Sequence, residues 1–216
     1  MESPKYIVIE GSIGVGKTSL VKMLSQEFSA RMILEPSDKN PFLENFYQDR
    51  GKFAFQTQIF FLINRFEQQQ EIAQQDLFQR NIIADYLFAK DRIFAYLNLD
   101  EREVKLYEDI YSLLEGNVVT PDLVVFLQAS TDVLLKRIKK RAIPYEQRIS
   151  REYLESLNAA YNDFFFNYDA NPLLTVNTSD IDFVNNQDDY QMLIREIGDL
   201  KMGKRYLNIR KDGTIW

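Results

Sequence analysis

The feature that most constrains this chain is an apolar strand that runs directly into a glycine-rich loop. The strand reads Tyr-Ile-Val-Ile-Glu over residues 6–10. The loop follows the pattern G-x-x-x-x-G-K-[ST], with Gly11, Ser12, Ile13, Gly14, Val15, Gly16, Lys17 and Thr18. Glycines at these positions permit a tight turn whose backbone N–H groups converge on phosphate oxygens. The pattern therefore predicts a nucleoside triphosphate site instead of a purely structural turn.

The last two residues of the loop add charge and a metal ligand to that site. Lys17 places a positive charge near the β- and γ-phosphates, and the Thr18 hydroxyl is suited to bind Mg²⁺. A helix over residues 17–29 would begin at this point, and its N-terminal dipole also favours a bound anion.

Composition narrows the chemistry of such a site. The 216 residues include no cysteine and no histidine, so thiolate chemistry and His-based triads are excluded. Acid–base work must then fall to carboxylates, Lys, Tyr or water. A net charge of −6 argues against broad nucleic-acid binding, and no apolar run is long enough to span a bilayer. Because the first strand also leaves no room for a signal peptide, we expect a cytoplasmic protein.

One stretch breaks the acidic trend. Residues 136–151 contain seven Lys and Arg side chains and a single acid, Glu146. A charge run is often only a solvated helix face. In a triphosphate-binding protein, however, it predicts a polyphosphate clamp, with a basic lid over about 139–151.

Short apolar runs alternate with helical stretches along the chain. The expected strands are 5–10, 31–35, 81–85, 123–128 and 173–177, and the expected helices are 17–29, 41–50, 53–78, 101–115, 131–141, 150–168 and 187–200. Apolar strands separated by helices predict an α/β fold with a central parallel five-stranded sheet covered on both faces. We expect one domain over 1–202 and a C-terminal tail over 203–216, which could form a small hairpin around Asp212-Gly213.

Three of these strands end in an acid, namely Glu10, Glu35 and Asp85. In open α/β sheets ligands bind beyond the carboxyl ends of the strands, so Glu35 and Asp85 should lie beside the phosphate loop. An acid there can simply cap the next helix. Two acids in a histidine-free protein instead suggest a general base and a Mg²⁺ ligand, and the sequence does not decide which residue has which role.

The motifs elsewhere in the chain indicate which class of triphosphate-binding protein carries this loop. A regulatory GTPase should carry an Asn-Lys-x-Asp motif and an Asp-x-x-Gly switch, and neither occurs in a suitable place. A small-molecule kinase fits better, because a basic lid can close over the phosphates and neutralise charge during transfer.

Further segments carry a more specific resemblance. They are 35–47, 53–58 with Arg65, 83–86 with 94–95, and 135–141. Together with the loop they resemble the deoxyribonucleoside kinase family, most closely its bacterial deoxyguanosine/deoxyadenosine kinase branch, from the loop to about residue 190. The resemblance implies a P-loop kinase three-layer sandwich, a homodimer, and ATP-dependent phosphorylation of a deoxyribonucleoside at its 5′-hydroxyl, with purines preferred.

The resemblance also implies roles on the acceptor side. Glu35 matches a carboxylate that faces the 5′-hydroxyl, and Tyr47 a tyrosine that contacts the 3′-hydroxyl. Gln58 matches a glutamine that reads the base edge. Arg65 lies seven residues further on, so both side chains should project from one helix face.

The family's Asp/Glu-Arg-Ser motif corresponds to Asp85 and the residues after it. Here Tyr86-Leu87 replace Arg-Ser, so the basic contact usually made there is missing, and we count Tyr86 among the candidate substrate contacts. Asp91 resembles a base-discriminating aspartate, although a helix-capping role would explain it equally well.

On the donor side, Arg137 and Arg141 match arginines for the transferring phosphate. A further arginine usually follows where Ile143 stands, so one clamp contact is either missing or supplied by Arg148 or Arg151. Glu152 resembles a second 3′-hydroxyl contact. The loop with Asp180 and Asp182 falls where the family holds the adenine of ATP.

The hypothesis is therefore an ATP–Mg²⁺ deoxynucleoside kinase of nucleoside salvage. One alternative is a nucleoside monophosphate kinase such as thymidylate kinase, which shares the loop, sheet and lid but needs cations for its acceptor phosphate. Another is a non-catalytic P-loop switch, which binds nucleotide without consuming it. The Phe-rich stretch 53–66 could form the dimer surface or belong to the core.

Overall fold

A six-stranded, wholly parallel sheet forms the centre of the molecule, and its strand order is β2-β3-β1-β4-β5-β6. The computed structural model describes residues 4–75 and 81–208. The strands are β1 Tyr6–Gly11, β2 Arg31–Ile33, β3 Ile82–Ala84, β4 Leu123–Gln128, β5 Leu173–Asn177 and β6 Lys204–Leu207. The α/β class and the parallel sheet predicted from the sequence are confirmed.

The expected number of five strands is wrong. The sixth strand, β6, comes from the segment predicted to be a tail, and Leu173 to Val176 of β5 pair with Lys204 to Leu207. Three of its four side chains are exposed, so β6 lacks the apolar run that marks the other strands. The possible hairpin around Asp212-Gly213 lies outside the described residues.

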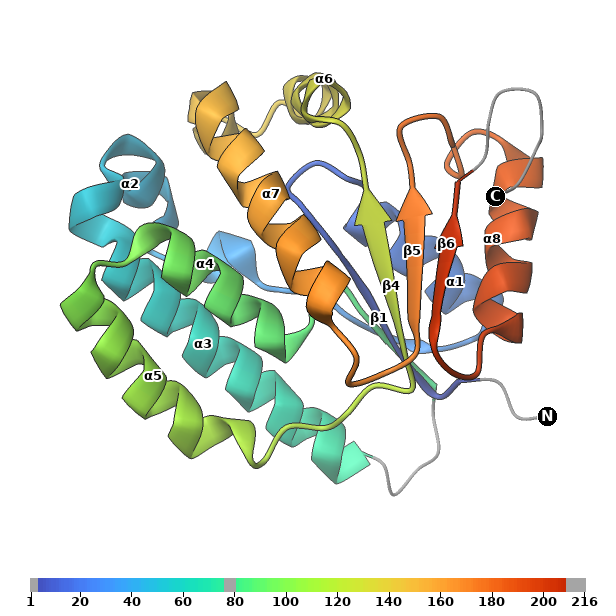
Figure 1. Cartoon of the computed structure of the whole chain (residues 1–216), viewed down its shortest axis with the longest axis horizontal. Helices are drawn as coiled ribbons and strands as arrows, with labels where there is room; N and C mark the ends of the chain where they lie inside the picture. Colours follow the sequence, from blue (N-terminus) through green and yellow to red (C-terminus); the bar gives the residue numbers. More distant parts are fainter. Residues whose placement is uncertain (1–3, 76–80, 209–216) are drawn as a thin grey trace.

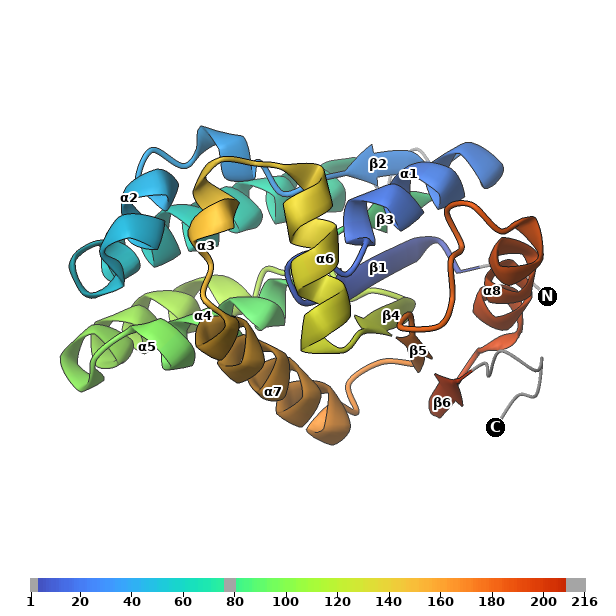
Figure 2. The same cartoon turned by 90° about the horizontal axis from the view of Figure 1, so that it is seen from above.

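Helices cover both faces of the sheet. They are α1 Lys17–Glu27, α2 Leu43–Gln48, α3 Arg50–Gln75, α4 Asp91–Asn98, α5 Glu101–Glu115, α6 Thr131–Arg141, α7 Arg151–Asn167 and α8 Gln187–Asp199. Figures 1 and 2 show α1 and α8 on one face, and α3, α4 and α7 on the other, with α5 outside α3 and α4. The result is the expected three-layer sandwich, although α4 was not expected.

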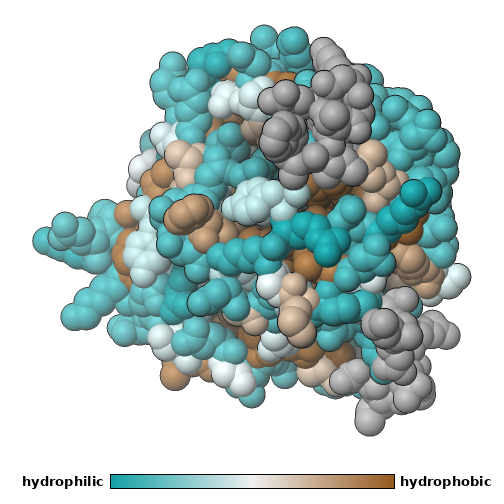
Figure 3. All heavy atoms as spheres, turned by 45° about the vertical axis from the view of Figure 1, so that its right-hand side comes forward, coloured by the Kyte–Doolittle hydropathy of each residue, from teal (hydrophilic) through white to brown (hydrophobic). Residues whose placement is uncertain are grey.

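The core lies between the sheet and these two layers. Its largest fully buried side chains include Phe126, Tyr161 and Phe165, and the Phe126 and Phe165 rings stack with centroids 4.2 Å apart. Figure 3 shows a mainly hydrophilic surface with scattered apolar side chains on the side that carries α8 and β6. Within residues 4–75 and 81–208, no helix is long and apolar enough to cross a membrane.

The carboxyl ends of the strands all point to one edge, which α6 crosses (Figures 1 and 2). After α6, a 3₁₀ turn η4 (Tyr145–Arg148) leads into α7, so the predicted lid spans the end of α6, this turn and the start of α7. The phosphate loop leaves β1 at the same edge. The parallel topology therefore brings the loop, the strand-end acids and the basic segment together.

Candidate active site

A cavity of about 900 Å³ opens at the carboxyl edge of the sheet. Its lining comes from the phosphate loop and the start of α1, the segment from Leu34 to Arg65, Asp85 after β3, Phe94 and Asn98 of α4, the end of α6 with the lid, and residues 181–185. Donor-side and acceptor-side residues from the sequence analysis therefore share one space. Most of the predicted site residues line it, namely Ile13, Gly14, Val15, Gly16, Lys17, Thr18, Glu35, Tyr47, Gln58, Arg65, Asp85, Arg137, Arg141 and Asp182.

The phosphate loop depends on glycine for its shape. Gly14 has φ +83°, and a Cβ at this position would lie 2.8 Å from a side-chain carbon of Ile138 on α6. Gly16 has φ +112° and occupies the N-cap of α1, so no side chain caps the first N–H groups of that helix. The Nζ of Lys17 donates hydrogen bonds to the carbonyls of Gly11 (2.7 Å) and Ser12 (3.2 Å). Uncapped N–H groups and a lysine at one helix terminus form an anion site.

Asp85 connects the donor and acceptor sides. One of its carboxylate oxygens accepts a hydrogen bond from the Thr18 hydroxyl at 3.0 Å, and the other accepts one from the backbone N–H of Glu35 at 2.7 Å. The strand-end acids thus lie beside the phosphate loop, as the topology predicts. Both oxygens of Asp85 have protein partners, whereas the Glu35 side chain extends into the cavity.

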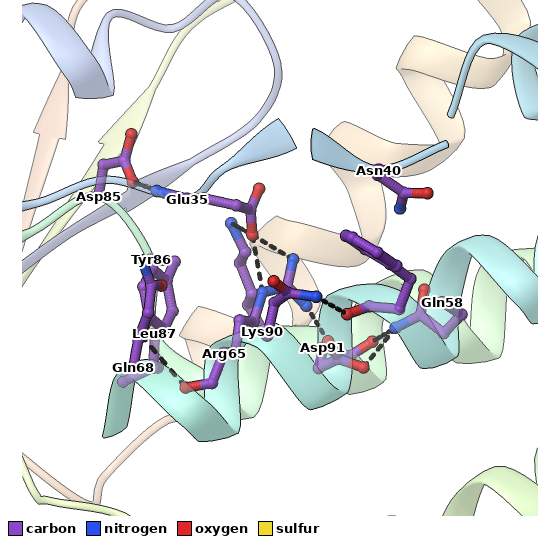
Figure 4. A network of polar contacts seen from close by, with 12 residues as sticks. Glu35, Asn40, Gln58, Arg65, Gln68, Asp85, Tyr86, Leu87, Lys90 and Asp91 are labelled. Atoms are coloured by element: carbon purple, nitrogen blue, oxygen red, sulfur yellow. Dashed lines mark hydrogen bonds and ion pairs between the residues drawn. The ribbon is translucent and has the colours of Figure 1, made fainter. Parts of the chain in front are cut away.

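The two oxygens of Glu35 have different surroundings. Its Oε1 contacts Arg65, whose Nε donates at 2.7 Å, and lies 3.4 Å from the Nζ of Lys90. Its Oε2 accepts no hydrogen bond from the described residues, and Figure 4 shows that oxygen turned away from both cations. Burial raises the pKa of Glu35, but the charges of Arg65 and Lys90 outweigh burial and bring the pKa down to about 2.

Beneath the cavity, α3 and α4 hold a buried polar network. The side-chain nitrogen of Gln58 donates to the backbone carbonyl of Asp91 at 2.9 Å and also to its carboxylate, which pairs in addition with Arg65. Gln58 and Arg65 therefore do project from one face of α3. We call Glu10, Glu35, Gln58, Arg65, Lys90 and Asp91 the floor cluster, and Figure 4 shows most of it.

Sequence reasoning missed Lys90 and gave Glu10 no role. Lys90 ends the 3₁₀ turn η3 (Phe88–Lys90), and its side chain is only 3% exposed. Its Nζ lies 3.5 Å from Glu10 Oε1, in addition to its contact with Glu35. A basic group is therefore present near the acids although Tyr86-Leu87 replace Arg-Ser. A signal that could have revealed it is a lone lysine among apolar residues, Leu87-Phe88-Ala89, shortly after a buried strand.

Cations from α6 approach the cavity from the donor side. Arg137 donates to the carbonyls of Val15 (2.9 Å) and Thr178 (2.8 Å), so it links the phosphate loop to the segment after β5. Arg141 pairs with Glu146, which accepts from its Nε at 3.0 Å. Lys140, which the sequence did not single out, also lines the cavity.

Neither arginine proposed to replace the missing lid cation lines the cavity. Arg148 is exposed on η4, and Arg151 pairs with Asp132 and Glu155 on the surface. Ile143 itself contributes an apolar side chain to the lining. Ile143 therefore fills the position of the family's arginine without supplying a positive charge.

Tyrosines close the cavity where α2 faces the lid. The ring of Tyr47 stacks on that of Tyr145, with centroids 5.7 Å apart and an interplanar angle of 14°. Burial, followed by the neighbouring Tyr153 and Glu146, raises the pKa of Tyr47. Its hydroxyl therefore stays protonated at neutral pH and can donate a hydrogen bond.

Six predicted site residues are not part of the lining. Gly11 and Ser12, at the start of the phosphate loop, are buried, and Asp91 is buried beneath Gln58. Tyr86 is also fully buried, with its hydroxyl 3.4 Å from the carbonyl of Arg65. Glu152, on the first turn of α7, and Asp180, in the loop after β5, are exposed outside the cavity. Tyr86, Glu152 and Asp180 therefore do not contact the cavity.

Comparison with known proteins shows which family combines these features. The family model described as deoxynucleoside kinase matches residues 7–201, which include the loop, both acids, α3 and the lid. The chain belongs to the deoxynucleoside kinase family. It is accordingly an enzyme that transfers a phosphoryl group to a deoxynucleoside, and the alternatives of a monophosphate kinase and a non-catalytic switch lose their support.

Individual relatives and solved structures agree. The chain is 37% identical to a deoxyguanosine kinase of Bacillus subtilis (strain 168), over 93% of this chain and 99% of that relative. It is 30% identical to a deoxyadenosine/deoxycytidine kinase of the same organism, over 88% and 90%. The structure of deoxyadenosine kinase from M. mycoides with bound dATP has a TM-score of 0.76 at 28% identity, covering 88% of this chain and 97% of that one.

Proposed function

We propose that this kinase uses ATP and Mg²⁺ to phosphorylate the 5′-hydroxyl of a purine deoxynucleoside, in deoxynucleoside salvage. The observation that carries the proposal is the placement of Glu35. Its Oε2 is the anionic oxygen of the acceptor side that has no partner among the described residues, and Asp85 links the Glu35 backbone to the phosphate-loop residue Thr18. A hydroxyl bound to Glu35 would therefore lie next to the transferred phosphate.

Glu35 would orient the hydroxyl and accept its proton as the new O–P bond forms and the bond to the leaving ADP breaks. With a pKa of about 2, Glu35 is anionic at neutral pH but a weak base. A weak base suffices, because phosphoryl transfer depends mainly on positioning and charge neutralisation. Lys17, Arg137 and Arg141 would supply that neutralisation.

The residues beside the phosphate loop fit a magnesium ion. The Thr18 hydroxyl and the Asp85 carboxylate oxygen lie 3.0 Å apart, and both are hard oxygen ligands. The described residues contain no cluster of three or more acidic side chains that could hold a metal alone. That arrangement suits Mg²⁺, which takes one or two protein ligands and completes its shell with phosphate oxygens and water. When bound, the ion would neutralise charge on the phosphates.

Preference for a purine is supported by the relatives, whereas Gln58 provides an acceptor that both purines and pyrimidines can use. Asp91 accepts both hydrogen bonds that the Gln58 side-chain nitrogen can donate, so Gln58 presents its carbonyl oxygen to the base. Adenine offers its 6-amino group to such an acceptor, and guanine its N1–H and 2-amino group. The relatives include both deoxyguanosine and deoxyadenosine kinases, so the proposal covers both purine bases.

We also propose a cytoplasmic homodimer that binds no nucleic acid. The Phe-rich stretch of α3 is largely half-buried, and Leu62 is part of the core. Exposed apolar side chains remain on α3 (Ile63) and α5 (Leu106, Leu113), and they could form a subunit contact. Light scattering coupled to gel filtration would give the mass, and a monomer at micromolar concentration would contradict a dimer.

A coupled assay of ADP release tests the function. The four deoxynucleosides and their 5′-monophosphates would be compared as acceptors with ATP–Mg²⁺. We expect kcat/KM for deoxyguanosine or deoxyadenosine to exceed that for thymidine by at least about tenfold, which is a discrimination that one well-placed polar contact can supply. Turnover of monophosphates but not nucleosides would refute the proposal.

A further inference from the structure

Lys90 is a buried cation with two carboxylate partners. Its Nζ lies 3.4 Å from Oε1 of Glu35 and 3.5 Å from Oε1 of Glu10, and its side chain is 3% exposed. A buried ammonium group is costly unless it is paired, so these two contacts must account for its presence. Figure 4 shows Lys90 beside Glu35 and Arg65.

The two carboxylates that Lys90 joins have different degrees of freedom. Glu10 is fully buried, and its oxygens accept hydrogen bonds from the backbone N–H groups of Gly11 (2.9 Å) and Leu87 (2.7 Å). It is therefore fixed by the main chain. Glu35 is 19% exposed and extends into the cavity from a short segment after β2. Lys90 thus connects a fixed carboxylate to one whose orientation is otherwise less restricted.

Arg65 alone would not fix the Glu35 carboxylate. Its guanidinium also pairs with Asp91, and it approaches Glu35 from α3. Lys90 approaches from η3, on a different element. Contacts from two directions define the position of Oε1, and Figure 4 shows the remaining oxygen turned away from both cations in a residue that lines the cavity.

We infer that Lys90 is a positioning residue for phosphoryl transfer. With Arg65, it holds Oε1 of Glu35 against the fixed Glu10, so that Oε2 faces the acceptor hydroxyl. The inference rests on the proposed role of Glu35. It differs from a purely structural role because it links Lys90 to turnover through one named oxygen.

Three variants test the inference. Lys90→Met removes the charge and keeps most of the stem, Lys90→Arg restores the charge, and Lys204→Met removes a lysine at the opposite edge of the sheet. We expect Lys90→Met to lower kcat by about 10- to 100-fold, since a displacement of 1 Å can cost ~100-fold. The KM for ATP should change by less than about threefold, because uniform binding is unaffected. Lys90→Arg should recover most of the loss, and Lys204→Met should match the wild type.

Thermal unfolding and nucleotide binding would show that each variant is folded. If Lys90→Met does not fold, Lys90→Gln replaces it, because its amide is polar but uncharged and one bond shorter than the lysine side chain, so it does not hold both carboxylates. The same loss of kcat is expected. Wild-type kcat in a folded, neutral Lys90 variant would overturn the inference.

A double-mutant cycle separates this inference from the proposed function. If Lys90 acts through Glu35, adding Lys90→Met to Glu35→Gln should lower kcat by less than about threefold further. A full, additive loss would overturn the inference. Wild-type kcat in Glu35→Gln alone would instead overturn the proposed role of Glu35. Turnover of monophosphates would overturn the proposed acceptor. Each failure therefore has its own signature.

Discussion

The floor cluster and the lid face each other across the same cavity, yet different kinds of interaction hold them. In the floor cluster, Arg65 and Lys90 are each 3% exposed, and they pair with the fully buried Glu10 and Asp91 and with Glu35, which is 19% exposed. In the lid, Arg141 is 43% exposed, and Arg151 and its partner Asp132 are at least half exposed. Buried pairs are costly to break, whereas exposed pairs contribute little.

This difference matches what phosphoryl transfer requires on each side. The acceptor hydroxyl must be held in line, so the groups that orient it should be rigid. The lid must admit and release nucleotide, so its contacts should break easily. We therefore expect substitutions in the floor cluster to affect stability and turnover, and substitutions in the lid to affect turnover alone.

The largest effect should come from Arg65→Met, which breaks the floor cluster at its centre. Removal of this cation leaves Glu35 and Asp91 without a main partner, and we expect the free energy of unfolding to fall by about 3–5 kcal/mol. Urea denaturation would measure it. Arg205→Met is the matched control, since Arg205 pairs with Glu196 at 2.7 Å on the surface. It should cost about 0–1 kcal/mol, and equal losses in both variants would contradict the comparison.

Glu35→Gln should have the next largest effect, and on turnover. We expect kcat to fall by at least ~100-fold, because the amide cannot accept the hydroxyl proton. The coupled ADP assay would measure it. Asp85→Asn tests the alternative in which Asp85 is the general base. Wild-type turnover in both variants would refute proton transfer to either carboxylate.

The phosphate loop and the placement of several cavity residues could be predicted from the sequence. The phosphate loop is a local pattern, since its glycines, lysine and threonine are consecutive and β1 and α1 flank it directly. The positions of Glu35 and Asp85 followed from strand ends in a parallel sheet. The shared face of Gln58 and Arg65 followed from helical periodicity.

The contacts within the floor cluster could not be predicted in the same way, because the residues that pair there are distant in sequence. Lys90 pairs with Glu10, 80 residues earlier, and only the packed structure brings them together. The helix α4 is short, and no side chain caps its N-terminus, so no local signal marked its start. Likewise β6 joins the sheet through backbone pairing with β5, which its exposed side chains do not reveal.

A smaller effect, confined to turnover, is expected in the lid. Arg141→Gln should lower kcat about tenfold, roughly 1.4 kcal/mol of transition-state stabilisation, because Lys17 and Arg137 still neutralise charge. The free energy of unfolding should fall by about 1 kcal/mol at most, because Arg141 is 43% exposed, although its partner Glu146 is only 10% exposed. A large loss of stability would show that the lid is as firmly held as the floor cluster.

The smallest effect is the contribution of Glu35 to the pH dependence of stability. Arg65 and Lys90, supported by Lys17, outweigh burial and lower the pKa of Glu35 from 4.5 to about 2 in the folded protein. A lowered pKa contributes stability that is complete above the unfolded value and is lost as pH falls toward the folded one. In buffer without metal or nucleotide, the difference in unfolding free energy between wild type and Glu35→Gln should stay constant from pH 8 to about 5.5. It should then shrink by about 1 kcal/mol or less on reaching pH 4. A difference that stays constant down to pH 4 would mean that the two cations do not stabilise the charged form of Glu35, and the floor cluster would then be no more tightly coupled than the lid.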